Sequence, residues 1–503
     1  MISSKDRYFA TLVSGYFLMA LQIVLSLATV PLALKYLGKE TFGVWSLGVQ
    51  VATWMLLLDA GMNGAIARYL IDYKDNLEDE NLARCISTGF RVFSLQGIII
   101  LFATFFIGKL SGPAFGLSMS EAAEFGHVVM MIGFGTSLGF VGKIMQSWLY
   151  AKQRLDLCNN VSIVLGALEF LIFWFLLVKG GGIYAFAWAR VVVSILGFVT
   201  FWVAGIRLSH FPAHFLKKKY DSAMFHKLAS YGGGVFLLTI GVQLLTMSQT
   251  AMVTKTLGLA AAAVWATAPK LFQLVIQTVA KLWDYRVPHL SSLMASDERS
   301  ILKRDFNQLF RAIAYIGGGL LGVVISLNPV FLQIWTHGKI YWNPINDGLI
   351  GIAFYSSMLI RCITDFVMHT KKIGWMPFLM LCEGIVFVAL SLIFLPKFGI
   401  SGMLCASLIA GGALRLPYAW VKFREYLDFS KKYGRALVVH AMGGVFLGVI
   451  ISILLWVVAR GLSSLTPWIS LVCQSLVSAL VIGPVVFKLG MDLMRTTKKT
   501  QAT

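Results

Sequence analysis

Charged side chains interrupt the long apolar segments of this sequence, and these are the residues best placed to do chemistry. They are Asp59, Arg68, Glu169, Arg190, Lys270, Arg361, Asp365, Glu383 and Arg415. A charge near the centre of a bilayer costs about 2.5–3.5 kcal/mol on insertion scales, so such groups usually face a bundle interior or a water-filled cavity. Arginine offers a planar fork and lysine a compact charge, and both suit phosphate oxygens. The set therefore predicts a cavity of mixed charge, with an excess of cations, that binds an anionic phosphate group.

Lys270 is the first candidate for contact with that anion. It lies about ten residues, or about 15 Å, inside its apolar segment, and the sequence places no carboxylate three or four residues away. Pro269 precedes it and predicts a kink or an opening of the helix at this point. Arg361 is the second candidate. Asp365 follows it by four residues on the same helix face, so a structural salt bridge is the alternative for this arginine.

Arg68, Arg190 and Arg415 complete the cationic set. Arg68 and Arg415 lie near the ends of their segments that are predicted to be cytoplasmic, where extension of the side chain to the interface is the alternative to binding. Arg190 lies in the outer half of its segment, at a depth that suggests a pair with Glu169. Lys143 also lies near the predicted inner surface, and there we expect the side chain to reach the interface.

The carboxylates within the apolar segments are candidates for coupling transport to an ion gradient. A buried Asp or Glu can exchange a proton or bind Na⁺, which makes Asp59, Glu169 and Glu383 candidates for ion coupling. The alternative for each of these three residues, and for Asp365, is that the carboxylate acts as a fixed counter-ion to a Lys or Arg. We expect no catalytic residues, no metal site and no resident cofactor, and the candidate coupling ions are H⁺ and Na⁺.

Composition places these charges in a membrane protein. The chain has 503 residues, of which 58% are hydrophobic and only 13% are charged, whereas a soluble domain carries about 25% charged residues. The formal net charge is +20, but the basic residues are spread through short loops between apolar segments, so membrane topology explains them better than nucleic-acid binding. The six cysteines show no Cys-x-x-Cys spacing and suit small core residues.

The apolar segments predict an all-α fold, because continuous runs of about 20 apolar residues span a bilayer as helices. We expect about fourteen spans near 9–34, 42–70, 86–108, 123–148, 157–178, 183–206, 229–254, 260–283, 309–327, 347–369, 373–395, 398–420, 436–459 and 467–488. One set of loops holds 26 Lys and Arg residues and the alternating set holds 8. Both termini are therefore expected on the cytoplasmic side. Trp45, Trp148 and Trp342 lie near span ends and fit interface anchors.

An internal repeat organises these spans. The segment that begins at Lys35 and the segment that begins at Lys255 share Lys, Leu-Gly and Val-Trp in register at a shift of 220 residues. A weaker match pairs Gly182-Ile183 with Gly399-Ile400. A repeat of six spans predicts two lobes related by an axis along the membrane normal, with a central cavity. We expect an N-lobe at 1–206, a basic cytoplasmic linker at 207–228, a C-lobe at 229–420, and two further helices with a basic tail at 421–503.

Two motifs carry a family resemblance. The first is Pro31-Leu-Ala-Leu-Lys-Tyr-Leu-Gly-Lys-Glu-Thr-Phe-Gly-Val-Trp45, and the second is Leu58-Asp-Ala-Gly-Met-Asn-Gly-Ala-Ile-Ala-Arg68. With these motifs, the chain resembles the polysaccharide transporters of the Wzx type, which belong to the same superfamily as multidrug extruders and lipid II flippases. The resemblance covers essentially the whole chain. It implies a rocker-switch flippase that carries an isoprenoid-pyrophosphate-linked oligosaccharide across a bacterial inner membrane for O-antigen and other surface polysaccharide.

Two other function classes remain as alternatives. An ion-coupled small-molecule or multidrug antiporter of the same superfamily would favour an acidic cavity, against which the intramembrane Lys and Arg argue. A membrane-embedded polysaccharide polymerase or ligase would need catalytic groups on a sizeable outward loop, and the predicted outward loops are short. We therefore expect a transporter rather than an enzyme. Its partners would be the lipid-linked oligosaccharide, the phospholipid membrane and, through cytoplasmic loops, a polymerase or glycosyltransferases.

Overall fold

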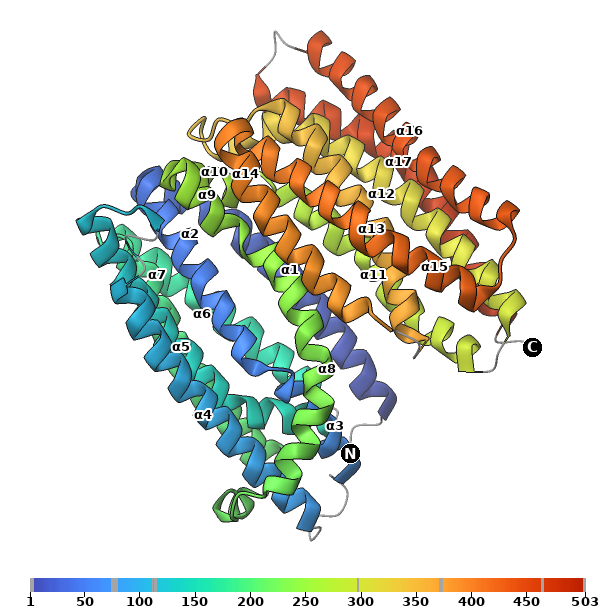
Figure 1. Cartoon of the computed structure of the whole chain (residues 1–503). Helices are drawn as coiled ribbons and strands as arrows, with labels where there is room; N and C mark the ends of the chain where they lie inside the picture. Colours follow the sequence, from blue (N-terminus) through green and yellow to red (C-terminus); the bar gives the residue numbers. More distant parts are fainter. Residues whose placement is uncertain are drawn as a thin grey trace. The chain divides into compact units, whose positions relative to one another are not determined.

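The computed structural model describes residues 4–73, 80–110, 112, 115–152, 154–295, 298–370, 374–462 and 466–500, and these are helical almost throughout (Figure 1). The chain forms two compact units, Met1–Ala263 and Val264–Thr503. Among the described residues there is no strand, as a polytopic helical membrane protein requires. The all-α membrane class predicted from the sequence is confirmed.

Unit 1 contains a helical layer built from long antiparallel neighbours. Its helices are α1 (Ser4–Tyr36), α2 (Gly38–Met55), α3 (Met62–Tyr73), α4 (Glu80–Leu110), α5 (Met119–Ala151), α6 (Leu155–Val178), α7 (Tyr184–Val203), α8 (Ser222–Met247) and α9 (Gln249–Leu257). Helices α4 and α5 run side by side along their length (Figure 1). Short turns η1 (Leu56–Asp59), η3 (Ala204–Leu208) and η4 (Ala213–Lys217) join the longer helices.

Helix α10 (Leu259–Thr267) leads into unit 2. The helices that follow are α11 (Lys270–Ala295), α12 (Arg299–Trp335), α13 (Pro344–His369), α14 (Met376–Ala410), α15 (Leu416–Leu427), α16 (Lys431–Gly461) and α17 (Pro467–Thr500), with a π-helical turn η5 (Gly411–Arg415) between α14 and α15. The side chains of the basic tail predicted at the C-terminus lie outside the described residues.

When helices are counted as spans by their length and hydropathy alone, the number is slightly below the fourteen predicted from the sequence. Eleven helices of the described chain qualify, or twelve when the bent pair α10–α11 counts as one span. The continuous segment Met376–Leu427 has 52 residues and would be about 78 Å long, more than twice the roughly 30 Å of a hydrocarbon core. Gly399 breaks it with φ of 60° and ψ of −149°, so this segment contains two passes. The exact number of fourteen stays a prediction.

The repeat motifs share a backbone conformation. Gly38 and Gly258, which end the two matching Leu-Gly motifs, have φ of 78° and 85°. Gly182 and Gly399, the weaker match, have φ of 55° and 60°. A positive φ is strained for any residue with a Cβ, so glycine is the natural choice at each turn. Both members of each matching pair therefore have a glycine of positive φ.

Glycine also decides how the C-terminal helices pack in unit 2. Gly318 and Gly322 on α12 lie against Gly444 and Gly448 on α16, and a Cβ on either α12 residue would overlap the backbone of α16. This small-residue contact lets the two helix backbones approach closely, as in other membrane helix pairs. Helix α16 is thereby held in unit 2 by close backbone contact, in addition to the apolar side-chain cluster around Ile451 and Leu455.

Candidate functional site

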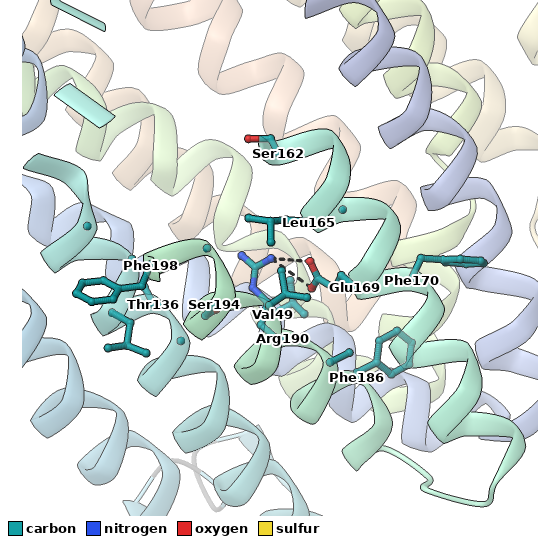
Figure 2. A pocket seen from close by; sticks show the side chains of 18 of the residues that line it. Val49, Thr136, Ser162, Leu165, Glu169, Phe170, Phe186, Arg190, Ser194 and Phe198 are labelled. Atoms are coloured by element: carbon teal, nitrogen blue, oxygen red, sulfur yellow. Dashed lines mark hydrogen bonds and ion pairs between the residues drawn. The ribbon is translucent and has the colours of Figure 1, made fainter. Parts of the chain in front are cut away.

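A cavity of about 790 Å³ lies in unit 1, bounded by residues from α1, α2, α5, α6 and α7 (Figure 2). This volume is within the usual range for ligand pockets. Its polar lining consists of Gln22, Ser26, Thr29, Thr136, Lys143, Gln146, Ser162, Glu169, Arg190 and Ser194. The wall thus offers many hydrogen-bonding groups at the depth of the membrane, where water-exposed polar atoms need an aqueous cavity.

Glycines on one face of α5 open this space. Gly135, Gly139 and Gly142 line the cavity at the spacing of successive helix turns. A Cβ added at Gly139 would meet no atom within 4 Å. The missing side chain at Gly139 therefore leaves part of this space open, whereas Gly135 allows Ser194 of α7 to approach α5 closely.

Arg190 and Glu169 form an ion pair inside the cavity. The Arg190 Nη1 atom lies 3.2 Å from Glu169 Oε2 and 3.3 Å from Oε1. Figure 2 shows the guanidinium beside the carboxylate, with Ser194 and Val49 nearby. The Arg190 side chain remains 52% exposed and that of Glu169 31%, so both face open space. The pairing of these two residues, inferred from depth alone, is confirmed.

Lys143 and Asp59 form a second ion pair, which the sequence did not predict. Lys143 Nζ lies 2.6 Å from Asp59 Oδ1 and 3.5 Å from the centre of the Phe140 ring. The expectation that Lys143 reaches the interface is wrong, because its side chain is only 18% exposed and lines the cavity. Gly135, Gly139 and Gly142 recur at helical spacing on α5, and Lys143 follows them directly. This pattern was the sequence signal that could have identified Lys143 as a cavity residue.

Arg68 marks a second hollow, of about 520 Å³, beside the first. Arg68 Nη1 donates to Asp72 Oδ1 at 2.7 Å, one turn further along α3. Gln146, Ser162 and Phe201 line both hollows. The two are therefore adjacent along α5, α6 and α7.

Together the two hollows carry a cationic excess. Arg68, Lys143 and Arg190 line them, and Glu169 is the only carboxylate among the lining residues that the structure describes. The other two cations are paired as well, Lys143 with Asp59 and Arg68 with Asp72, whose carboxylates are not among the lining residues. An anion entering this space would meet three cations whose present partners are all exchangeable carboxylates.

Aromatic rings form the other wall of the larger cavity. Phe186 stacks on Trp45 at 4.3 Å between ring centroids and on Phe173 at 4.0 Å. Trp45 thus lines the cavity as well as lying near a span end. Trp148 differs from its prediction as an interface anchor: it is fully buried and donates from Nε1 to the Ser209 carbonyl oxygen.

In unit 2, Arg361 is held between two carboxylates. Its Nη2 atom lies 2.9 Å from Asp284 Oδ1, and its Nε atom lies 3.0 Å from Asp365 Oδ2. This is the geometry of a structural salt bridge, which the position of Asp365 in the sequence suggested as the alternative to anion contact. Asp284 lies 77 residues away in sequence, so no local pattern could have identified it. A role of Arg361 in anion contact stays a prediction.

Glu383 and Arg415 form a buried ion pair in the same unit. Arg415 Nε lies 3.0 Å from Glu383 Oε2, and their side chains are 12% and 2% exposed. The π-helical turn Gly411–Arg415 brings the arginine to the carboxylate. The two atoms are close enough for an ion pair but are not aligned for a hydrogen bond. In this conformation Arg415 points to a carboxylate in the core rather than to the interface.

Lys270 begins α11 directly after a bend. Helices α10 and α11 meet at 40° across Ala268 and Pro269, which confirms the break predicted from the proline. The Ala268 carbonyl oxygen, freed at the break, accepts a hydrogen bond from Asn328 Nδ2 at 3.2 Å. Within the described part of the chain, no carboxylate lies within ion-pair distance of Lys270. Its role in anion contact stays a prediction.

Comparison with known proteins decides the family. A family model described as polysaccharide biosynthesis protein matches residues 9–294, which is more than half of the chain. The chain belongs to this family. The resemblance found in the two sequence motifs is confirmed.

One curated relative and several solved structures are similar to the chain. A Salmonella typhi protein provisionally named as an O-antigen transporter is 20% identical over 400 residues, covering 75% of this chain and 87% of the relative. The structure of the lipid II flippase MurJ in an inward closed conformation matches 96% of this chain and 99% of its own, with a TM-score of 0.71 at 15% identity.

Other transporters are similar as well. An inward-facing MATE family transporter of the MOP superfamily matches 81% of this chain and 96% of its own, with a TM-score of 0.62 at 12% identity. A MOP superfamily transporter from Pyrococcus furiosus matches 85% and 97%, with a TM-score of 0.58 at 13% identity. At these identities the likeness shows the fold, which the lipid II flippase and the MATE family transporter share.

Proposed function

We propose that the chain is a flippase that moves an isoprenoid-pyrophosphate-linked oligosaccharide across a bacterial inner membrane by alternating access. The observation that carries this proposal is the pair of adjacent hollows in unit 1, which three cations and many hydrogen-bonding side chains line. The family membership and the similarity to MurJ support it. The family contains proteins of polysaccharide biosynthesis, and a flippase there would serve the assembly of surface polysaccharide such as O-antigen.

The chemistry of the cavity suits the two polar parts of such a substrate. A pyrophosphate carries at least two negative charges, and Arg68, Lys143 and Arg190 supply charge-assisted hydrogen bonds for its oxygens. The glycan carries many hydroxyls, which would be costly to desolvate in hydrocarbon. Gln22, Ser26, Thr136 and their neighbours offer them hydrogen bonds, and Trp45 in the cavity wall offers an apolar ring for stacking. The isoprenoid tail would stay in lipid.

A small-molecule antiporter is the second candidate function, because MATE transporters share the fold. A drug cation would need a site with carboxylates free to bind it. In this cavity the Glu169 carboxylate is already paired with Arg190, and the one remaining charge of the lining, on Lys143, is positive. The charge balance therefore favours an anionic substrate. Coupling to H⁺ or Na⁺ through Asp59, Glu169, Asp365 or Glu383, and docking of a polymerase or glycosyltransferases, remain part of the proposal.

The test is flipping by purified protein in liposomes. A labelled isoprenoid-pyrophosphate oligosaccharide is placed in the inner leaflet, and its exposure to an impermeant quencher is followed with and without protein. Arg190→Gln should slow protein-dependent exposure by about 10-fold or more, because a charge-assisted hydrogen bond contributes about 1.5–3 kcal/mol. Lys422→Gln is the matched control, since it removes a cation paired with Glu425 at 2.7 Å outside the cavity.

Two outcomes would contradict the proposal. The first is the absence of protein-dependent exposure with several glycans, with and without a proton or Na⁺ gradient. Uptake of a cationic dye under the same gradients would then favour the antiporter. The second is full flipping by Arg190→Gln and by the double variant Glu169→Gln/Arg190→Gln, which removes both charges and so leaves no unpaired carboxylate.

A further inference from the structure

The second span is broken beside the cavity. Helix α2 passes into the short turn η1, which ends at Asp59, and α3 starts afresh at Met62. Between them, Ala60 has φ of 48° and Gly61 has φ of 73°. A left-handed conformation is strained for alanine, so it persists only where surrounding contacts hold it. The break therefore needs an explanation in the contacts around it.

Asp59 is the centre of those contacts. Its Oδ2 atom accepts a hydrogen bond from the Asn63 backbone N–H at 3.2 Å, which caps the start of α3. Its Oδ1 atom accepts from Lys143 Nζ at 2.6 Å, and its main-chain oxygen accepts from Gln96 Nε2 at 3.2 Å. One carboxylate thus joins α3 to α5 and caps the new helix.

Two neighbouring contacts fix the break from other sides. Ser147 on α5 donates to Asn63 Oδ1 at 3.0 Å. Gly61 lies so close to α8 that a Cβ would be 2.6 Å from the Gly232 carbonyl oxygen. Of the groups that hold the break, Lys143 is the one that lines the larger cavity. It is therefore the group through which an occupant of that cavity can act on the break.

We propose that Lys143 exchanges Asp59 for the phosphate group of the substrate, and that this exchange releases the break between α2 and α3. The inference rests on the proposed function, because it identifies the substrate group at this position as an anionic phosphate. A phosphate oxygen competes directly with a carboxylate for an ammonium, since both accept charge-assisted hydrogen bonds. Once Asp59 loses Lys143, its carboxylate keeps only the contact with the Asn63 N–H, so the strained turn loses its link to α5 through Lys143.

The proposal gives Lys143 and Asp59 opposite effects on binding. Lys143 is a binding residue, and Asp59 is a positioning residue that competes with the substrate for it. Asp59→Asn should therefore tighten the binding of an anionic lipid and yet slow flipping, because the break no longer responds to the ligand. A merely structural role of Asp59 would weaken both.

The test uses the purified full chain in detergent with farnesyl pyrophosphate as the probe. Farnesol serves as the uncharged comparison and inorganic pyrophosphate as the comparison without a lipid tail. Asp59→Asn should bind the probe about 3- to 10-fold more tightly, and Lys143→Gln about 10-fold or more weakly. Lys143→Arg should keep most of the affinity. Glu425→Gln, which breaks the Lys422 pair outside the cavity, should bind like the wild type.

Hydrogen–deuterium exchange of the peptide covering residues 56–66 reports on the break itself. We expect faster exchange there in Asp59→Asn and Lys143→Gln without ligand, and in the wild type when farnesyl pyrophosphate is added. The double variant Asp59→Asn/Lys143→Gln leaves no unpaired charge. It should exchange as fast as the single variants but should not bind farnesyl pyrophosphate. Glu425→Gln should leave exchange in this peptide unchanged.

The proposal is overturned if Asp59→Asn changes neither the affinity nor the exchange, or if Lys143→Gln binds the probe as tightly as the wild type. If the wild type still flips a lipid-linked glycan in that case, the proposed function stands and only the exchange mechanism fails. If the wild type neither binds the probe nor flips the glycan, both fail.

Discussion

The buried pair of Glu383 and Arg415 tests whether an intramembrane arginine serves structure or substrate. Both residues were candidates for function on sequence grounds, and the structure places them 3.0 Å apart with the carboxylate almost fully buried. The informative changes are Glu383→Gln, Arg415→Met and the two together. Each single change leaves one charge in the core without its partner, and the double change removes both.

The size of the effect follows from burial. Removing one partner of a buried ion pair costs about 3–5 kcal/mol, because the remaining charge is uncompensated, whereas removing both is often close to neutral. Unit 2 spans 240 residues, and for a unit of that size 1 kcal/mol lowers Tm by about 2 °C. We therefore expect each single variant to lower Tm by about 6–10 °C, and the double variant to recover at least half of that loss.

The assay is thermal unfolding in detergent alongside flipping in liposomes. Glu425→Gln provides the comparison, since its pair with Lys422 is more exposed and such pairs contribute about 1 kcal/mol or less. The reasoning is refuted if Arg415→Met keeps the wild-type Tm but abolishes flipping. That result would make Arg415 a substrate contact whose pairing with Glu383 contributes little to the fold.

Three further predictions concern packing and the anion path. Gly322→Ala should destabilise the protein by about 1–3 kcal/mol, because its Cβ would overlap the backbone of Gly448; Gly319→Ala on the same helix, with nearest atoms at 3.6 Å, should leave Tm unchanged or raised. Gly139→Trp should block flipping without lowering Tm, since its side chain would extend into open cavity; normal flipping would show that the substrate passes elsewhere. Lys270→Ala should slow flipping at a normal protein level, and full flipping after removal of both Lys270 and Arg361 would refute the anion contacts assigned to unit 2.

The local features of the chain were readable because they depend on neighbouring residues only. The break before Lys270 follows from Pro269, since proline cannot donate to the preceding helical turn. The matching turns at Gly38 and Gly258 follow from glycine's tolerance of positive φ. The Glu169–Arg190 pair was within reach because adjacent helices in a hairpin place residues of similar depth side by side.

The contacts between distant segments were not readable in the same way. Lys143 lies 84 residues from Asp59, and Arg361 lies 77 residues from Asp284. Which carboxylate an intramembrane cation meets depends on the rotation of each helix about its axis and on which helices become neighbours. Trp148 shows the same limit, because its position near a span end suggested the interface while packing with Phe211 and the Ser209 carbonyl oxygen buried it.

By itself, the sequence determined that this is a helical membrane protein of a polysaccharide biosynthesis family, with a repeat and with charges inside its spans. Hydropathy, loop charge and helix-breaking residues act over one helix at a time, so a linear pattern records them. Only the tertiary structure decided that three cations line two adjacent hollows in unit 1, and that in unit 2 Arg361 lies between two partly exposed carboxylates while Arg415 pairs with a buried one. A cavity and an ion pair exist only when helices pack, and packing is set by the fit of whole helix faces.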